Sequence, residues 1–289
     1  MTRAVAIGLI LVIIPLLLFQ RHLLYHPRHY AADDAVPAPL ERLNFTTTDG
    51  AQAAWWRAPL GSSGAAPQRV WLVFSGNAGT AWDWVGLRSE PVGPVGILLI
   101  DWPGFGASQG TPSPASILRA ADGAVAALAG KLGLSIEDLR RRCGVLGHSM
   151  GAAAALQYAE QRGAAAVVLV APFTSLLAMA QRVVGWPLCE LLLHRFDNDA
   201  ALASLAQRAD KPPVLILHGD ADTTIPLAMS RTLAAAHPGW VRLVEVPGAA
   251  HDDVLDLAWS NLRDALSMPL PTSSLPTASP PTHPPTTNR

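Results

Sequence analysis

Leu146-Gly147-His148-Ser149-Met150-Gly151 decides the fold of this chain, because it joins two stretches of different character. A short apolar run at residues 144–146 leads into it, and an alanine-rich run at residues 152–159 follows it. A Gly-x-Ser-x-Gly motif in this setting predicts a strand, a sharp turn and a helix. The two glycines leave room for a tight turn, so we expect an exposed Ser149 hydroxyl. The backbone N–H of Met150 would then point to where an oxyanion can form.

A second Gly-x-Ser-x-Gly match, residues 106–110, has a different setting. It lies between Asp101-Trp102-Pro103-Gly104 and Thr111-Pro112-Ser113-Pro114, a loop rich in proline and glycine. No strand runs directly into this loop and no helix can start directly after the motif. We therefore interpret Ser108 as a loop hydroxyl that satisfies backbone groups, and Ser149 as the nucleophile candidate.

The composition fits one large α/β domain with additional segments at its ends. The chain has 289 residues, of which 50% are apolar and 15% charged, and its net charge of -1 gives no electrostatic argument for nucleic acid. The two cysteines, Cys143 and Cys189, are too few for a disulfide scaffold and are expected to be unpaired thiols. Neither has the spacing of a zinc ligand, and we expect no metal and no cofactor.

The ends of the chain differ from its centre. An apolar run at residues 4–19 is shorter than a typical membrane span of about 20 residues and has no cleavage pattern after it. We interpret residues 1–24 as an uncleaved membrane or signal anchor, with a cleaved signal peptide and a buried core helix as the alternatives. Residues 25–40 are expected to be a linker, 41–267 the folded domain, and 268–289 a disordered tail rich in Pro, Thr and Ser.

Six apolar runs are spaced for a parallel sheet covered on both faces by helices, and a hairpin at residues 41–47 and 53–57 precedes them. The runs are residues 70–74, 97–100, 144–146, 166–170, 214–217 and 241–246. Such a sheet binds ligands at the carboxyl ends of its strands, where the polar clusters of this chain occur. Residues 172–210 are longer than a simple crossover and predict a small cap over the edge that carries Ser149.

A serine nucleophile needs a base, and the base needs a carboxylate that fixes its tautomer. In a fold of this type the acid follows the serine in sequence. Asp220 and Asp222 both follow the strand at 214–217, and Asp220 comes at once after the tight His-Gly turn, where an aspartate serves the turn itself. Asp222 is therefore our candidate acid, while Asp210 precedes its strand and would lie at the opposite edge.

Three histidines remain as candidates for the base. His251 comes just after the last strand, at the edge where Ser149 is expected. His237 precedes that strand and so faces the opposite edge, and His283 lies in the tail. His251 is our candidate base. A second oxyanion donor is expected from the small-residue loop after the strand at 70–74, with Asn77 as the best candidate.

In the order and spacing of these motifs the chain resembles membrane-anchored α/β-hydrolases of the Bem46-like group. That group is related to the serine aminopeptidase-type hydrolases and to the ABHD protein depalmitoylases. The matching motifs are Leu23-Leu24-Tyr25-His26-Pro27, Gly76-Asn77-Ala78-Gly79, Asp101 to Ser108, Gly147 to Gly151, Arg195-Phe196-Asp197, His218 to Asp222 and Gly248 to His251.

The resemblance implies an α/β-hydrolase fold with a mostly parallel central sheet, helices on both faces and a small cap insertion. It implies a triad of Ser149, Asp222 and His251, with the amides of Asn77 and Met150 as the oxyanion hole. The chain departs from its relatives at Ser75-Gly76, where they have His-Gly. In those relatives the histidine shapes the oxyanion loop. Its replacement by Ser75 leaves the nucleophile intact, but the resemblance does not determine the geometry of the oxyanion hole.

We therefore expect a serine hydrolase that cleaves an ester, thioester or amide through an acyl-enzyme, with lipid-like acyl substrates favoured. The alternative is a membrane-tethered protein that keeps the fold without activity, which the intact triad order argues against. Dinucleotide binding at Gly104-Phe105-Gly106 fails because Gln109 occupies the position of the last glycine and no helix follows. An anchor of this kind in a bacterial protein would place the domain on the periplasmic side.

Overall fold

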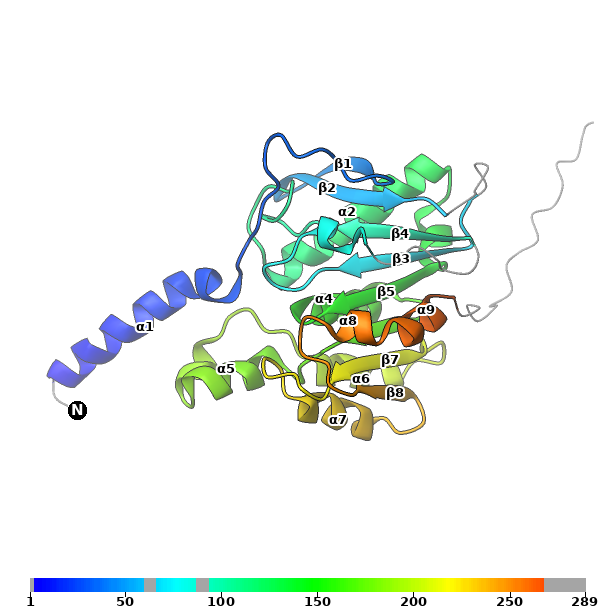
Figure 1. The fold of residues 1–289 in the computed structure, drawn as a ribbon. Coiled ribbons are helices and arrows are strands. Elements are labelled where there is room, and N and C mark those ends of the chain that lie inside the picture. Colours follow the sequence, from blue (N-terminus) through cyan, green and yellow to red (C-terminus); the bar gives the residue numbers. More distant parts are fainter. Residues whose placement is uncertain (1–2, 60–65, 87–93, 268–289) are drawn as a thin grey trace, which may run out of the picture.

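An eight-stranded sheet runs through the centre of the molecule in the order β1-β2-β4-β3-β5-β6-β7-β8 (Figure 1). The computed structural model describes residues 3–59, 66–86 and 94–267. The strands are β1 (Glu41–Thr47), β2 (Gly50–Arg57), β3 (Arg69–Phe74), β4 (Val95–Ile100), β5 (Cys143–His148), β6 (Val167–Val170), β7 (Val214–Gly219) and β8 (Val241–Val246).

The pairing of the strands confirms the predicted α/β-hydrolase fold. Strands β3 to β8 are mutually parallel, while β1 and β2 form an antiparallel hairpin that joins the sheet through β4. Because the parallel strands end at one edge, the loops after β3, β5, β7 and β8 lie close together there.

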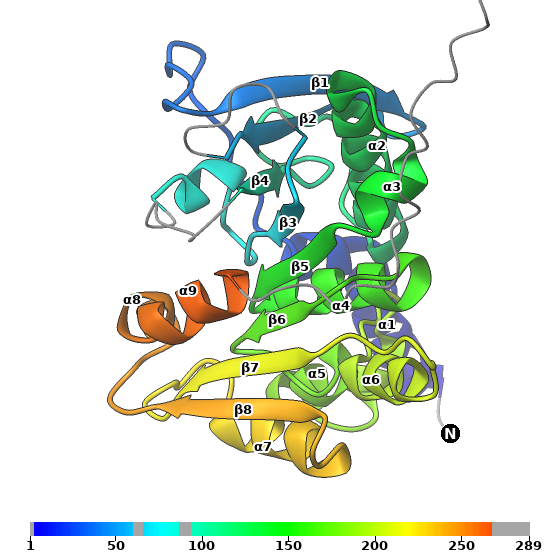
Figure 2. The same ribbon diagram turned by 90° about the vertical axis from the view of Figure 1, so that its right-hand side faces the viewer.

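Helices cover both faces of the sheet (Figure 2). They are α1 (Arg3–Leu24), η1 (Ala81–Trp84), α2 (Pro114–Leu132), α3 (Ile136–Arg140), α4 (Met150–Arg162), α5 (Leu176–Val184), η2 (Leu188–Leu191), α6 (Asn198–Ala206), α7 (Leu227–Ala236), α8 (Val254–Leu257) and α9 (Trp259–Ser267). One buried cluster joins the sheet to α2, α4, α6 and α7, and the other joins it to η1, α8 and α9. Strands β2 to β7 are therefore largely buried on both faces, as continuous apolar runs predict, whereas the edge strands β1 and β8 are partly exposed.

The segment after α1 packs onto the domain. Tyr25 is only 3% exposed and belongs to the larger core cluster. The Tyr30 ring stacks on Trp82 at 3.7 Å, and its hydroxyl donates to the buried carboxylate of Asp101 at 2.8 Å. Residues 25–30, which the sequence predicts as part of a linker, thus contribute to the core and to the edge that carries the site.

The two ends of the chain were predicted to lie outside the domain. Residues 3–24 form helix α1, and none of the helices in the described ranges is both long enough and apolar enough to cross a membrane. The tail predicted from residue 268 onward lies outside the described residues. Between β6 and β7, where a cap was predicted, the chain forms α5, η2 and α6.

Candidate active site

The elbow of the sequence motif forms as predicted, with Ser149 between β5 and α4. Its backbone is held at φ 57° and ψ -122°, a conformation that costs a side-chain-bearing residue on the order of 1–3 kcal/mol. A Cβ on Gly147 would come within 2.0 Å of the Gly151 carbonyl oxygen, and one on Gly151 would come within 2.2 Å of the Phe74 carbonyl oxygen. Both glycines are therefore required for the close approach of the elbow to itself and to β3.

Asp222 and His251 are brought together at the ends of β7 and β8. Asp222 Oδ2 lies 2.7 Å from His251 Nδ1, and Asp222 Oδ1 accepts hydrogen bonds from the backbone N–H groups of Thr224 and Ile225, both at 2.8 Å. The Asp222 side chain has no exposed surface. The carboxylate is therefore fixed in position, and its bond to Nδ1 leaves His251 Nε2 as the nitrogen available to act as a base.

The other candidate acids are engaged elsewhere. Asp220 Oδ1 accepts from the Gly248 backbone N–H at 2.7 Å, so it braces the loop that carries His251. Asp210 forms an exposed ion pair with Arg208 before β7, at the opposite edge of the sheet. Asp220 was predicted to serve the His-Gly turn itself, whereas its side chain binds the loop after β8.

His218 supports Asp222 and was not predicted as part of the site. Its Nε2 lies 2.8 Å from the Ile225 carbonyl oxygen and 3.3 Å from Asp222 Oδ2, and its Nδ1 lies 2.6 Å from Ser230 Oγ. Burial lowers the pKa of His218, which favours the neutral ring. A neutral ring that donates from Nε2 and accepts from Ser230 at Nδ1 satisfies all three contacts. The sequence motif gave a signal here, but we interpreted it only as a turn.

His148 contacts the same loop from the elbow. Its Nε2 lies 3.0 Å from the His251 carbonyl oxygen, and the two rings are 4.7 Å apart. Burial, helped by the neighbouring His251, lowers the pKa of His148 to about 4. At neutral pH the ring is uncharged and donates its Nε2–H to that carbonyl. His148, the variable residue before the serine of the motif, therefore fixes the backbone of His251, the candidate base.

The loop after β3 lies directly against the elbow, and the segment after α1 holds it there. A Cβ on Gly76 would lie 3.6 Å from the Ser149 Cβ, which shows how near the two backbones are. The Asn77 side chain turns away toward the N-terminal segment, where Nδ2 donates to the Leu24 carbonyl at 2.6 Å and Oδ1 accepts from the His26 N–H at 3.0 Å. The Asn77 side chain is therefore engaged away from the elbow, and the use of its backbone N–H as an oxyanion donor stays a prediction.

Replacing Asn77 by alanine should impair turnover although its side chain does not face Ser149. Loss of both hydrogen bonds frees the loop from residues 24–26, and displacing it by about 1 Å could lower kcat about 10- to 100-fold. Steady-state kinetics on an activated ester would measure this effect. The matched control is Asn44→Ala, an exposed asparagine on edge strand β1. If Asn77→Ala had the kcat of the wild type, the two hydrogen bonds of Asn77 to residues 24 and 26 would not be needed to position the loop.

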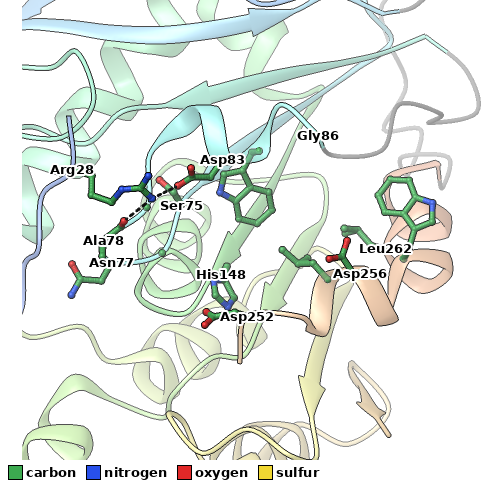
Figure 3. A pocket seen from close by; sticks show the side chains of 15 residues that line it. Arg28, Ser75, Asn77, Ala78, Asp83, Gly86, His148, Asp252, Asp256 and Leu262 are labelled. Carbon is green, nitrogen blue, oxygen red and sulfur yellow. Dashed lines mark hydrogen bonds and ion pairs between the residues drawn. The ribbon is translucent and has the colours of Figure 1, made fainter. Parts of the chain in front are cut away.

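A cavity of about 450 Å³ opens beside the elbow, between the loop after β3 and helices α8 and α9 (Figure 3). Four large apolar side chains line it, together with polar groups at its mouth, and it reaches His148, the residue before Ser149. The apolar residues are Trp84, Leu255, Trp259 and Leu262. At the mouth, Arg28 and Asp83 form an ion pair of 3.2 Å, and Asp252 and Asp256 add further carboxylates.

Three side chains beside the elbow could in principle receive a cation. His148, His251 and Asp252 each offer one ligand atom within 4.8 Å of the others. Since His251 Nδ1 is bonded to Asp222, an ion here would have to take the Nε2 nitrogen. Metal binding would therefore compete with the use of His251 as a base.

The residues that the sequence excluded lie away from this site. Ser108 is buried, and its Oγ accepts from the Ala53 N–H at 3.0 Å and lies 3.3 Å from the Asp101 carbonyl oxygen, which confirms its interpretation as a loop hydroxyl. His237 ends α7 before β8, at the opposite edge, with its ring against Trp240. Both cysteines are free and buried.

Comparison with known proteins agrees with this fold. Residues 71–200 match the model of the Alpha/beta hydrolase family. The chain is 33% identical over 243 residues to the protein Rv2307c of Mycobacterium tuberculosis, and the match covers 81% of each of the two chains. It is 28% identical over 179 residues to the mouse Alpha/beta hydrolase domain-containing protein 17C, covering 61% of this chain and 52% of that one.

Among solved structures, the esterase of Pyrococcus furiosus superposes with a TM-score of 0.60 at 18% identity, covering 83% of this chain and 94% of the esterase. Sheet order, elbow and sequence similarity therefore agree on one class, the hydrolases built on this fold. The chain belongs to the alpha/beta hydrolase family.

Proposed function

We propose that the protein is a serine hydrolase that cleaves acyl esters or thioesters through a covalent acyl-enzyme. One observation carries the proposal: a buried carboxylate holds the His251 ring at 2.7 Å, at the same edge of the sheet as the strained, half-buried turn of Ser149. This geometry suits nucleophilic catalysis, in which a fixed histidine removes the proton of a serine hydroxyl.

In the proposed mechanism, His251 Nε2 takes the proton of Ser149 as Oγ attacks the carbonyl carbon of the substrate. The Asp222 carboxylate, bonded to Nδ1, stabilises the imidazolium that forms. The backbone amides of Asn77 and Met150 would donate to the oxyanion, and removing one such donor typically costs about 10²–10³ in kcat. His251 then protonates the leaving group, and a water molecule activated by the same nitrogen releases the acid and restores Ser149.

Two observations support an acyl ester or thioester as substrate. The cavity beside the elbow has an apolar wall of Trp84, Leu255, Trp259 and Leu262, which suits a hydrocarbon chain. A solved relative of the same fold is an esterase. The proposal favours the lipid-directed hydrolases of the ABHD type over the aminopeptidase type, since the large side chains of the cavity wall are apolar.

The experiment is a panel of p-nitrophenyl esters and acyl thioesters of increasing chain length, with the matched p-nitroanilides. We expect ester and thioester turnover to exceed anilide turnover, with kcat/KM rising from acetyl to longer chains. Leu255→Trp narrows the cavity and should reverse the chain-length preference while acetyl ester turnover is retained. Faster cleavage of the anilides than of the esters would contradict the proposed substrate class.

A further inference from the structure

Large exposed apolar side chains are concentrated on one part of the molecule. Eight of the eleven such side chains in the described residues belong to α1 or to the cap, and their exposed fractions range from 42 to 80%. We call these eight the apolar face: Ile14, Leu18, Phe19, Leu23, Val183, Val184, Trp186 and Leu193. Isolated exposed apolar residues are ordinary, but a concentration of this kind marks an interaction site.

Hydrogen bonds join the two parts of the apolar face into one unit. The Gln20 side chain of α1 accepts from the Leu193 N–H at 2.8 Å, and Arg21 Nε lies 3.3 Å from His194 Nε2. The other nitrogen of His194 lies 3.1 Å from the Tyr25 hydroxyl. Figure 1 shows α1 and α5 projecting from the same side of the molecule, the side toward which β3 points. The apolar face therefore adjoins the edge of the sheet that carries Ser149.

The charges around the apolar face are mainly cationic. The sequences of α1 and α5 contain no Asp or Glu, and Arg21, His22 and Arg182 are exposed. The nearby Glu190 is paired with Arg195 at 3.3 Å. Since the whole chain has a net charge of -1, this local excess of cations is not a general property of the protein.

We propose that the apolar face docks onto an anionic lipid surface, with the cap as well as α1 in contact with the lipid. Apolar helical faces flanked by arginine, with an exposed tryptophan, are typical of segments that lie in a membrane interface. Arg21 and Arg182 can bury their methylene groups while their guanidinium groups reach lipid phosphates. Docking in this way turns the edge with Ser149 toward the lipid and does not depend on hydrolysis.

The test is binding of the full chain to phosphatidylcholine vesicles with and without phosphatidylglycerol, measured by co-sedimentation. The variant is Val183→Glu with Trp186→Glu, two substitutions on the cap at side chains that are 80% and 76% exposed. We expect the wild type to bind the anionic vesicles more tightly, and the double variant to bind them about tenfold more weakly. The control is Ile136→Glu, an exposed apolar residue of α3, which precedes β5 and so lies at the opposite edge.

A second measurement reports contact by the cap itself. Tryptophan fluorescence should be quenched by brominated lipid in the wild type, and the quenching should fall in Trp186→Phe, whose melting temperature should match that of the wild type. Equal vesicle binding by the double variant and the wild type would overturn the proposal. The proposal would also be overturned if the wild type did not bind vesicles but formed a dimer, and if the double variant were monomeric. The apolar face would then bind a second copy of the chain.

Discussion

Ser149→Ala should lose hydrolysis of activated esters almost completely, by about 10⁴- to 10⁶-fold in kcat. The hydroxyl is the attacking group in the proposed mechanism, and no other residue can replace it at the strained turn between β5 and α4. The melting temperature should stay close to that of the wild type, because the substitution removes one oxygen atom at the elbow. Initial rates with p-nitrophenyl acetate and thermal unfolding would measure both effects.

The second Gly-x-Ser-x-Gly motif supplies the matched control. Ser108→Ala should keep most of its activity but lose stability, because the Ala53 N–H loses its buried acceptor, at a cost of about 1–3 kcal/mol. Each serine variant thus isolates one property, catalysis for Ser149 and folding for Ser108. An inactive Ser108→Ala together with an active Ser149→Ala would show that the wrong motif had been chosen.

The second large effect is expected at the base. His251→Ala removes the ring held by Asp222, and kcat should fall by about 10⁴-fold or more, since the serine then has no proton acceptor. His237→Ala should be nearly neutral for kcat, because that ring packs on Trp240 at the amino end of β8. The same ester assay measures both variants.

Unfolding in denaturant serves as the control for the His251 variant. Removal of its ring leaves the buried Asp222 without one partner, so the fraction folded must be known before kcat is compared. Equal activity of the two folded histidine variants would contradict the assignment of His251 as the base.

The sequence predicts the fold well because its signals are local. The apolar run at residues 214–217 is largely buried in β7, and the run at residues 241–246 forms the edge strand β8, in which Arg242 and Glu245 are exposed. The Gly-x-Ser-x-Gly turn is equally local, since its glycines are needed for contacts within five residues and with the neighbouring strand. The pairing of Asp222 with His251 follows from chain order once the strands are placed, because both residues come after a parallel strand.

The supports of the site could not be predicted in the same way, because they depend on contacts between distant segments. The bond from His148 to the His251 carbonyl spans 103 positions of the sequence, and the bond from Asn77 to Leu24 spans 53. No periodicity or spacing reports such contacts. His218 is an intermediate case, since its motif was visible, but its bridge to Ser230 and Asp222 needs the packed position of α7.

The packing of residues 25–30 onto the domain could not be predicted from the sequence for a related reason. Prolines and the absence of a period in this stretch predict a linker. Tyr25 and Tyr30 nevertheless find partners in the cap and beside Asp101, elements that are far away in sequence. The N-terminal segment therefore packs together with the loop after β3 and the cap.

Covalent labelling tests the central claim, that Ser149 is an activated nucleophile. A fluorophosphonate reacts when the serine oxygen attacks phosphorus and displaces fluoride, so it needs the serine, its base and the oxyanion donors but no knowledge of the substrate. Wild type, Ser149→Ala and Ser108→Ala would be labelled and their peptides mapped by mass spectrometry. The account predicts one label on Ser149 in the wild type and in Ser108→Ala, and none in Ser149→Ala. A folded wild type that takes up no label, or that carries it on another serine, would contradict it.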